Sequence, residues 1–135
     1  MLELFDGFIG AIAAETSFNI KKEGAGHYSA VIVFDNGRKQ NVKMVLGEDD
    51  SGDPVLSYYS RICKVDSEEL KLYRDALKMN LALSYGAIGI QDDELVFHNS
   101  YYVKSMDPER FIKSLSYVAA KADELEEVLI ANDEN

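Results

Sequence analysis

Residues 28–46 read YSAVIVFDNGRKQNVKMVL, and this stretch decides the fold class. Side chains alternate on both sides of the central Asp35-Asn36-Gly37-Arg38, which is typical of two strands with one buried face each. The residues of that face are Tyr28, Ala30, Ile32 and Phe34 before the turn, and Gln40, Val42, Met44 and Leu46 after it. Asn-Gly is the strongest short hairpin signal, because a tight primed turn needs positive φ at its centre. The sequence therefore predicts an antiparallel hairpin.

The chain before this hairpin predicts a helix and one short strand. Apolar residues recur at three- and four-residue steps over residues 2–15, as on one face of a helix. They are Leu2, Phe5, Ile9 and Ile12. Gly7 and Gly10 each lower the helix propensity by roughly 1 kcal/mol, so this helix needs packing partners to be stable. A strand over residues 18–22 and a turn over residues 24–26 are expected to lead into the hairpin.

The chain after the hairpin predicts a loop, a strand and a second helix. Residues 47–54 read GEDDSGDP, an acidic loop. The following strand over residues 55–65 is apolar on both faces, as in a central strand or a strand at an interface. Asp66 and Glu69 have the spacing of a capping box, so Asp66 is expected to cap the helix. Gly86 is expected to stop that helix. Its expected buried stripe is Leu70, Tyr73, Leu77 and Leu81.

Two further strands and a long helix complete the chain. Residues 87–91 and 94–103 flank Asp92-Asp93 and predict a second hairpin. Residues 107–109 read DPE, where the Asp caps a helix, the Pro fits its first turn and the Glu suits the positive end of the helix dipole. The stripe of this helix is Phe111, Leu115, Val118, Ala122, Leu125 and Leu129.

These elements define an α+β fold. Consecutive hairpins make an antiparallel sheet, and helices at the two ends and in the middle of the chain cover it as a second layer. We expect a single antiparallel sheet of about five strands with three helices, in the order α-βββ-α-ββ-α. Residues 1–130 are expected to form one domain and residues 131–135 a polar tail.

The composition narrows the classes of function. The chain has 135 residues, with 14 Lys and Arg against 24 Asp and Glu and a net charge of -10. An acidic chain is poorly suited to bind nucleic acid or an anionic membrane surface, which both attract basic proteins. The apolar run over residues 8–14 lacks a basic leader and is too short to span a bilayer. A single cysteine, Cys63, fits a reducing compartment, so we expect a cytoplasmic protein.

No motif in the sequence predicts catalysis, a metal or a cofactor. The acidic loop fails the calcium-loop pattern, because a glycine stands at its first position and Tyr58 at its twelfth. His27, His98 and Cys63 are not at ligand spacing from one another. The glycine-containing turns match no phosphate-binding pattern. We therefore expect no enzyme activity, no cofactor and no metal.

The tyrosines are the strongest candidates for partner contacts. The chain has eight tyrosines and no tryptophan, and two adjacent pairs on strands each show a ring to both faces of the sheet. Tyrosine is enriched at protein interfaces, but the simpler alternative is that one ring of each pair packs under a helix and the other lies flat on the sheet, as is ordinary for aromatic residues on strands. Together with apolar residues of the first helix, the candidate partner-binding residues are Phe5, Phe8, Ile12, Tyr58, Tyr59, Tyr101 and Tyr102.

The charges are unevenly placed. Residues 121–135 hold one basic and six acidic side chains, whereas residues 21–43 hold five basic and two acidic ones. Two solvated faces would explain this distribution. Electrostatic self-association or steering of a partner is the functional alternative.

The second half of the chain resembles a known fold. A helix ends at Asn80, residues 85–88 read YGAI, residues 92–96 read DDELV, and residues 107–109 lead into a helix that ends ADELE at 122–126. This order is similar to the type III secretion chaperone-like fold, and within it to the YbjN-like family of bacterial sensory transduction regulators. The order of helices and strands matches over nearly the whole chain.

This resemblance implies a binding module and no chemistry. Proteins of this fold are typically homodimers, and the secretion chaperones among them hold an extended segment of a client polypeptide against apolar patches. The leading hypothesis is therefore a homodimeric polypeptide-binding or regulatory module. One alternative is a small-molecule-binding protein or small enzyme that uses a cavity between sheet and helices. Another is a subunit of a larger complex that docks through its acidic last helix.

Overall fold

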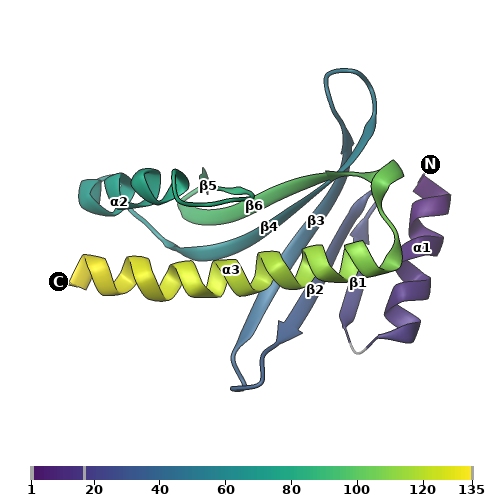
Figure 1. The fold of residues 1–135 in the computed structure, drawn as a ribbon, viewed down its shortest axis with the longest axis horizontal. Helices are drawn as coiled ribbons and strands as arrows, with labels where there is room; N and C mark the ends of the chain where they lie inside the picture. Colours follow the sequence, from purple (N-terminus) through teal and green to yellow (C-terminus); the bar gives the residue numbers. More distant parts are fainter. Residues whose placement is uncertain (1, 17, 135) are drawn as a thin grey trace.

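The computed structural model describes residues 2–16 and 18–134, without the side chains of residues 131–134. Within these residues it has three α-helices, one 3-10 turn and one sheet of six strands (Figure 1). The elements in chain order are α1 (Leu2–Glu15), β1 (Asn19–Gly24), β2 (His27–Val33), β3 (Lys39–Glu48), β4 (Pro54–Lys64), α2 (Leu70–Asn80), β5 (Ala87–Gln91), β6 (Glu94–Tyr102), η1 (Val103–Ser105) and α3 (Pro108–Glu134).

The sheet confirms the predicted α+β class with one strand more than expected. Its order is β1-β2-β3-β4-β6-β5, and every neighbouring pair is antiparallel. The expected count of about five becomes six in the described residues, because β1 pairs with β2 from Asn19↔Val31 to Gly24↔His27. The strand predicted to be central is β4, which lies between β3 and β6.

The hairpin of residues 28–46 forms as predicted, but its turn differs. The N–H of Gly37 donates to the carbonyl of Phe34 (2.9 Å), and the N–H of Phe34 donates to the carbonyl of Arg38 (2.8 Å). Gly37 has φ 88°, whereas Asn36 is not among the described residues with positive φ. A turn with negative φ at its centre, followed by a left-handed glycine, is the pattern of a three-residue hairpin loop. The sequence therefore predicted the position of the turn correctly, but the prediction of a primed turn was wrong.

Helix α3 covers the sheet and, within the described residues, contributes seven buried apolar residues to the core, more than either of the other helices. Asp107 caps it as predicted, since its Oδ1 accepts the N–H of Arg110 at 2.8 Å. All six residues of the predicted stripe are buried, and the helix packs on β3, β4, β6 and α2. Burial of each large apolar side chain contributes about 1.5–3 kcal/mol. The helix runs to Glu134 and so includes residues 131–134 of the expected tail.

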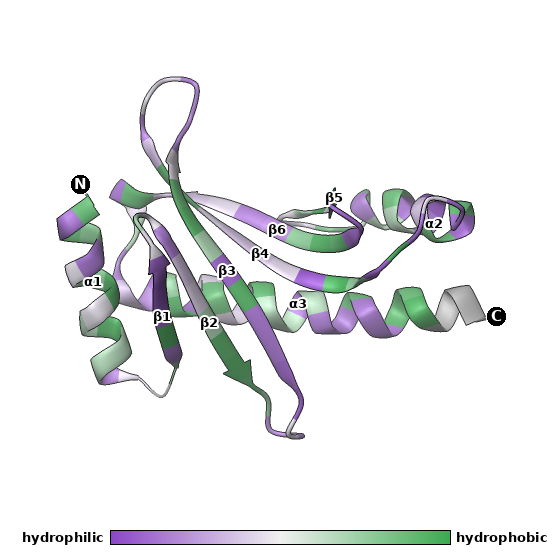
Figure 2. Cartoon of the chain, turned by 180° about the vertical axis from the view of Figure 1, so that it is seen from behind, coloured by the Kyte–Doolittle hydropathy of each residue, from purple (hydrophilic) through white to green (hydrophobic). Residues whose placement is uncertain are grey.

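The helices pack on the same face of the sheet. Phe5 of α1 contacts Tyr28 of β2 (ring centroids 5.6 Å), and Phe8 contacts Phe111 of α3 (5.8 Å). Figure 1 shows α2 beside the C-terminal half of α3, and Figure 2 shows the strands in front of α3 when the molecule is seen from behind. No helix of the described residues combines the length and the apolar character that crossing a membrane requires.

Helix α2 begins later in the chain than the sequence predicts, and the side of the helix that is buried differs from the predicted one. Its N-terminal cap is Glu69, while Asp66 accepts the N–H of Glu68 in the preceding turn. The buried residues are Leu72 and Ala76, with Tyr73 half-buried. The expected stripe was therefore wrong at its three leucines, which face solvent: Leu70, Leu77 and Leu81. Asn80 ends the helix, so Gly86 is not its stop and lies in the loop before β5.

The basic and acidic segments noted in the sequence contact each other at the surface of the protein. Arg38, in the loop between β2 and β3, lies 2.6 Å from Asp123 and 3.8 Å from Glu126 of α3, and it also pairs with Glu127. These carboxylates raise the pKa of the Arg38 guanidinium. These ion pairs join the tip of the β2–β3 hairpin to α3, so part of the uneven charge distribution serves a contact within the fold.

Among the glycines, Gly86 has the least room for a side chain. It has φ 77°, and a Cβ there would lie 2.5 Å from Cζ of Phe97 and 2.7 Å from the carbonyl oxygen of His98. We expect Gly86→Ala to lower the free energy of unfolding by about 3 kcal/mol or more, from backbone strain and overpacking together. Gly37→Ala, at φ 88° in open space, should cost about 1–2 kcal/mol. Urea unfolding of both variants tests this, and equal losses would contradict it.

Candidate functional site

Helix α1 is tied to the sheet by a polar cluster. The carboxylate of Asp6 accepts a hydrogen bond from the Tyr28 hydroxyl and pairs with the ammonium of Lys22 at 2.8 Å. The hydrogen bond from Lys22, followed by that from Tyr28, lowers the pKa of Asp6 below its usual 3.8. Burial and the Asp6 contact raise the pKa of Tyr28. The cluster fixes α1 over the edge of the sheet formed by β1 and β2.

The candidate residues of α1 are unequally placed. Phe5 and Ile12 are buried in the core, so their side chains are closed to a partner in this conformation. Phe8 is half-buried and lines a small apolar groove of about 170 Å³ between α1 and η1. We call this depression the α1–η1 groove; its lining residues are Leu4, Phe5, Phe8, Val103 and Met106. Leu4 was not among the predicted residues, yet it is 79% exposed.

The two tyrosine pairs also divide between core and surface. Tyr58 is fully buried, and burial raises its pKa. Tyr101 is half-buried beside it with the rings edge to face, 5.4 Å apart. Tyr59 and Tyr102 point to the opposite face of the sheet, where Tyr59 stacks on His98 at 5.8 Å. One ring of each pair therefore packs under the helix layer.

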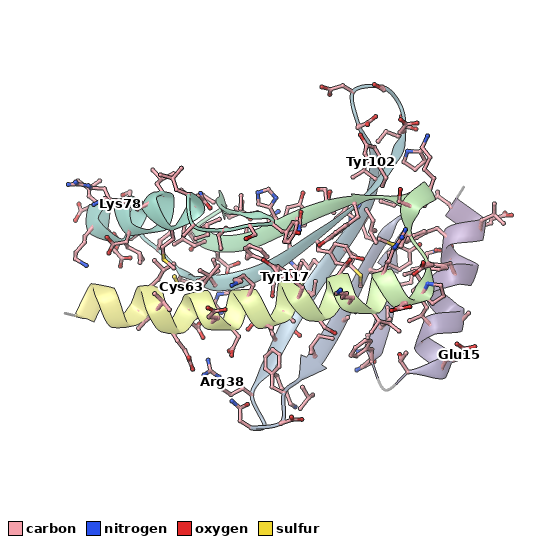
Figure 3. The ribbon with its side chains drawn as sticks, in the orientation of Figure 1. Glu15, Arg38, Cys63, Lys78, Tyr102 and Tyr117 are labelled. Carbon is pink, nitrogen blue, oxygen red and sulfur yellow. The ribbon has the colours of Figure 1, made fainter. Side chains whose placement is uncertain are left out.

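The face of the sheet opposite α3 has a shallow hollow. Its volume is about 490 Å³, and it spans β3, β4 and β6 beside the acidic loop. The hydroxyls of Ser57 and Ser100 hydrogen-bond across its floor at 2.8 Å. Tyr102 lies at its rim, where the neighbouring carboxylate of Asp49 raises the pKa of the Tyr102 hydroxyl (Figure 3). The hollow brings Tyr59 and Tyr102 together, apart from the first helix.

A second groove lies on the helix side of β6, and sequence reasoning missed most of it. We call it the tyrosine groove. It has a volume of about 340 Å³ and is lined by Tyr85, Tyr101, Arg110, Lys113, Ser114 and Tyr117. The four α3 residues among them are spaced i, i+3, i+4 and i+7, which places them on one stripe of a helix. That spacing was visible in the sequence beside the apolar stripe of the last helix.

The outer side of α2 is a third exposed surface. Leu70 and Leu77 are each 68% exposed, and Leu81, just after the helix, is 93% exposed. Residues 70 and 77 are seven apart and residues 77 and 81 four apart, so they share one side of the helix. We call these three leucines the α2 face. Apolar surface that remains exposed and continuous marks interaction sites in folded proteins.

The residues considered for chemistry lie apart from one another. His98 is on the sheet face with Tyr59, and Cys63 is buried in β4. In the acidic loop, Asp49 accepts the N–H groups of Ser51 and Asp53, each at 2.9 Å, so its carboxylate closes a hairpin loop. Within the described ranges there is no group of three or more His, Cys, Asp or Glu residues that could hold a metal ion.

A solved structure shares this fold. The crystal structure of the Yersinia pestis type III secretion chaperone SycH, in complex with a stable fragment of YscM2, matches with a TM-score of 0.57 and 17% sequence identity. The match covers 90% of this chain and 98% of that chain. The likeness confirms the chaperone-like fold. No protein-family model and no curated protein matches the chain, so membership of the YbjN-like family stays a prediction.

The Asp6 cluster makes the anchoring of α1 depend on pH. A carboxyl whose pKa is lowered by folding stabilises the fold above its unfolded pKa, and this contribution is lost as the pH falls through the folded value. We expect Asp6→Asn to destabilise the protein at pH 7, and the difference from the wild type to shrink below about pH 4. Urea unfolding at pH 7 and pH 3 measures this difference. Asp50→Asn, which removes the same single negative charge from an exposed loop, is the control. A difference that stays constant between the two pH values would contradict this role.

Proposed function

We propose that this chain is a non-enzymatic module that binds a segment of a partner polypeptide and acts as a homodimer in the cytoplasm. The observation that carries the proposal is the exposed apolar surface beside α1 and α2, on a fold shared with a chaperone that was crystallised with a polypeptide fragment. Exposed apolar clusters cost solubility and persist where a partner covers them. The YbjN-like kinship is part of the same proposal.

The α1–η1 groove suits a side chain of a polypeptide. Its volume of about 170 Å³ is below the ~300–1,000 Å³ that is usual for sites of drug-sized ligands. Its wall is rigid, because the Phe8 ring packs against Phe5 at 5.9 Å and against Phe111 at 5.8 Å. Leu4 extends the apolar surface outward from the groove. A peptide could place one apolar side chain in the groove and continue over Leu4.

Affinity capture tests polypeptide binding. Tagged protein is incubated with lysate of its native cells at low salt, and the captured proteins are identified by mass spectrometry. We expect the wild type to retain a stoichiometric partner, and Leu4→Lys/Met106→Lys to lose most of it, because two charges would enter the apolar groove. Lys39→Glu/Lys64→Glu, at exposed strand ends, is the control and should retain the partner. Equal capture by the groove variant would contradict the proposed site.

The α2 face is our proposed surface for the second copy. A twofold interface uses the same patch on both protomers, and a stripe of leucines on one helix side is complementary to itself. Lys71 pairs with Asp75 within the helix at 3.0 Å. The exposed Arg74, four residues after Leu70 and three before Leu77, lies on the same side as these leucines. Pairing of two such faces would remove three leucines per protomer from water.

Charge on the α2 face should separate the protomers. We expect Leu70→Lys/Leu77→Lys to elute as a monomer in size-exclusion chromatography with light scattering, where the wild type elutes as a dimer. The reason is that apolar burial is replaced by two like charges from each protomer. Leu4→Lys, an equally exposed leucine on α1, should leave the dimer intact. A monomeric wild type, or a dimeric double variant, would contradict the proposed interface.

A further inference from the structure

The tyrosine groove has a chemistry that the proposed function does not yet use. It adjoins a second hollow of about 290 Å³, which shares Tyr101, Arg110 and Ser114 with it and extends to Ser105 and Met106. The two together form an elongated depression between α3 and β6. It stays open because α2 covers the sheet beside the C-terminal half of α3 and leaves β6 uncovered beside the N-terminal half (Figure 1).

The aromatic walls of the groove are held in place by packing and hydrogen bonds. The rings of Tyr85 and Tyr117 meet edge to face at 6.3 Å, and Tyr117 also packs on Phe97 of β6 at 5.9 Å. The hydroxyl of Tyr101 accepts a hydrogen bond from the side-chain amide of Asn99 at 2.9 Å. Rigid tyrosines lose little side-chain entropy on binding, which makes them common anchors at interfaces.

The groove also carries positive charge in an otherwise acidic protein. Arg110 and Lys113 are both exposed on its rim. Arg110 lies 3.8 Å from Asp107 and donates to the carbonyl of Ser105 at 2.7 Å. Among the described residues, no carboxylate lies within 4 Å of the Lys113 ammonium. Lys121 lies over the Tyr117 ring at 6.0 Å from its centroid, but it pairs with Glu124 at 3.0 Å, so the cations that line the groove are Arg110 and Lys113.

We infer that the tyrosine groove binds an extended segment of the partner polypeptide that carries an acidic side chain next to an aromatic one. The inference rests on the proposed function and names the chemistry of the segment. Its carboxylate would pair with Lys113 and Arg110, and its ring would lie against Tyr85, Tyr101 and Tyr117. Arg110 and Tyr117 are seven residues apart, about 10 Å along a helix, which matches roughly three residues of extended peptide.

Charge complementarity selects this occupant over a longer polyanion. The net charge of -10 repels nucleic acid along most of the surface, whereas a short acidic segment meets only the two local cations. Two adjoining hollows along one helix also suit an extended chain better than a compact molecule. A small aromatic acid would engage the same cations and rings, and the experiment below separates it from a peptide.

Selection of displayed peptides on the folded 135-residue chain tests the inference. A library of random dodecapeptides is selected on the wild type and on Arg110→Glu/Lys113→Glu. We expect the wild type to enrich peptides in which Asp or Glu stands within two residues of Phe, Tyr or Trp. We expect the selected peptide, labelled with fluorescein, to bind the double variant at least about tenfold more weakly, because each cation is replaced by a repelling carboxylate. Its affinity should also fall as salt rises from 50 to 500 mM, by screening.

Three controls make the outcomes distinct. Lys39→Glu/Lys64→Glu makes the same change of net charge away from the groove and should keep the affinity, and Lys113→Glu alone covers the case that the double variant fails to fold. Enriched peptides without acidic residues, or binding unaffected by both groove variants, would overturn the inference and leave the proposed function standing. Enrichment of no peptide would overturn both. Binding of N-acetyl-phenylalanine as tightly as of the selected peptide would overturn the polypeptide occupant.

Discussion

The packing of α3 across one face of the sheet is the constraint on which the rest of the structure depends. Its buried stripe supplies large apolar side chains to the core, among them Phe111, Leu115 and Leu129. One helix cannot cover six strands, so α1 and α2 cover the two ends of the same face and leave gaps beside α3. The α1–η1 groove and the tyrosine groove are these gaps. The two grooves proposed for a partner therefore exist because the three helices cover the sheet incompletely.

The two ends of this helix layer are stabilised differently. The tip of the β2–β3 hairpin is joined to α3 through Arg38 and three carboxylates, whereas α1 is joined to the sheet through Asp6 and a few aromatic rings. Gly7 and Gly10 in α1 meet no neighbouring atom within 4 Å of a built Cβ, so they lower helix propensity without serving close packing. We therefore expect α1, beside the groove proposed for a partner, to have the lowest local stability of the three helices.

Sequence reasoning predicted the elements with long, unambiguous periods and failed where two patterns compete. The 28–46 hairpin was predicted because Asn-Gly marks its turn, and the α3 stripe because its apolar residues recur at three- and four-residue steps. Helix α2 has leucines at two phases, and packing on α3 buries Leu72 while Leu70 and Leu77 stay exposed. Phe5, Ile12 and Tyr58 were predicted to contact a partner but are buried between the helices and the sheet. The periodicity of the sequence does not show where the helices pack on the sheet. The tyrosine groove joins Tyr85 and Tyr101 to residues of α3 that lie nearby only after folding.

The most direct test of the central claim is amide hydrogen exchange of the full chain, with and without the polypeptide that affinity capture identifies. The account predicts slower exchange on binding in α1, in η1 and in the first three turns of α3, the segments that border the two grooves. Protection confined to β1 and β2, or to the sheet face opposite α3, would contradict the claim that the gaps in the helix layer hold the partner.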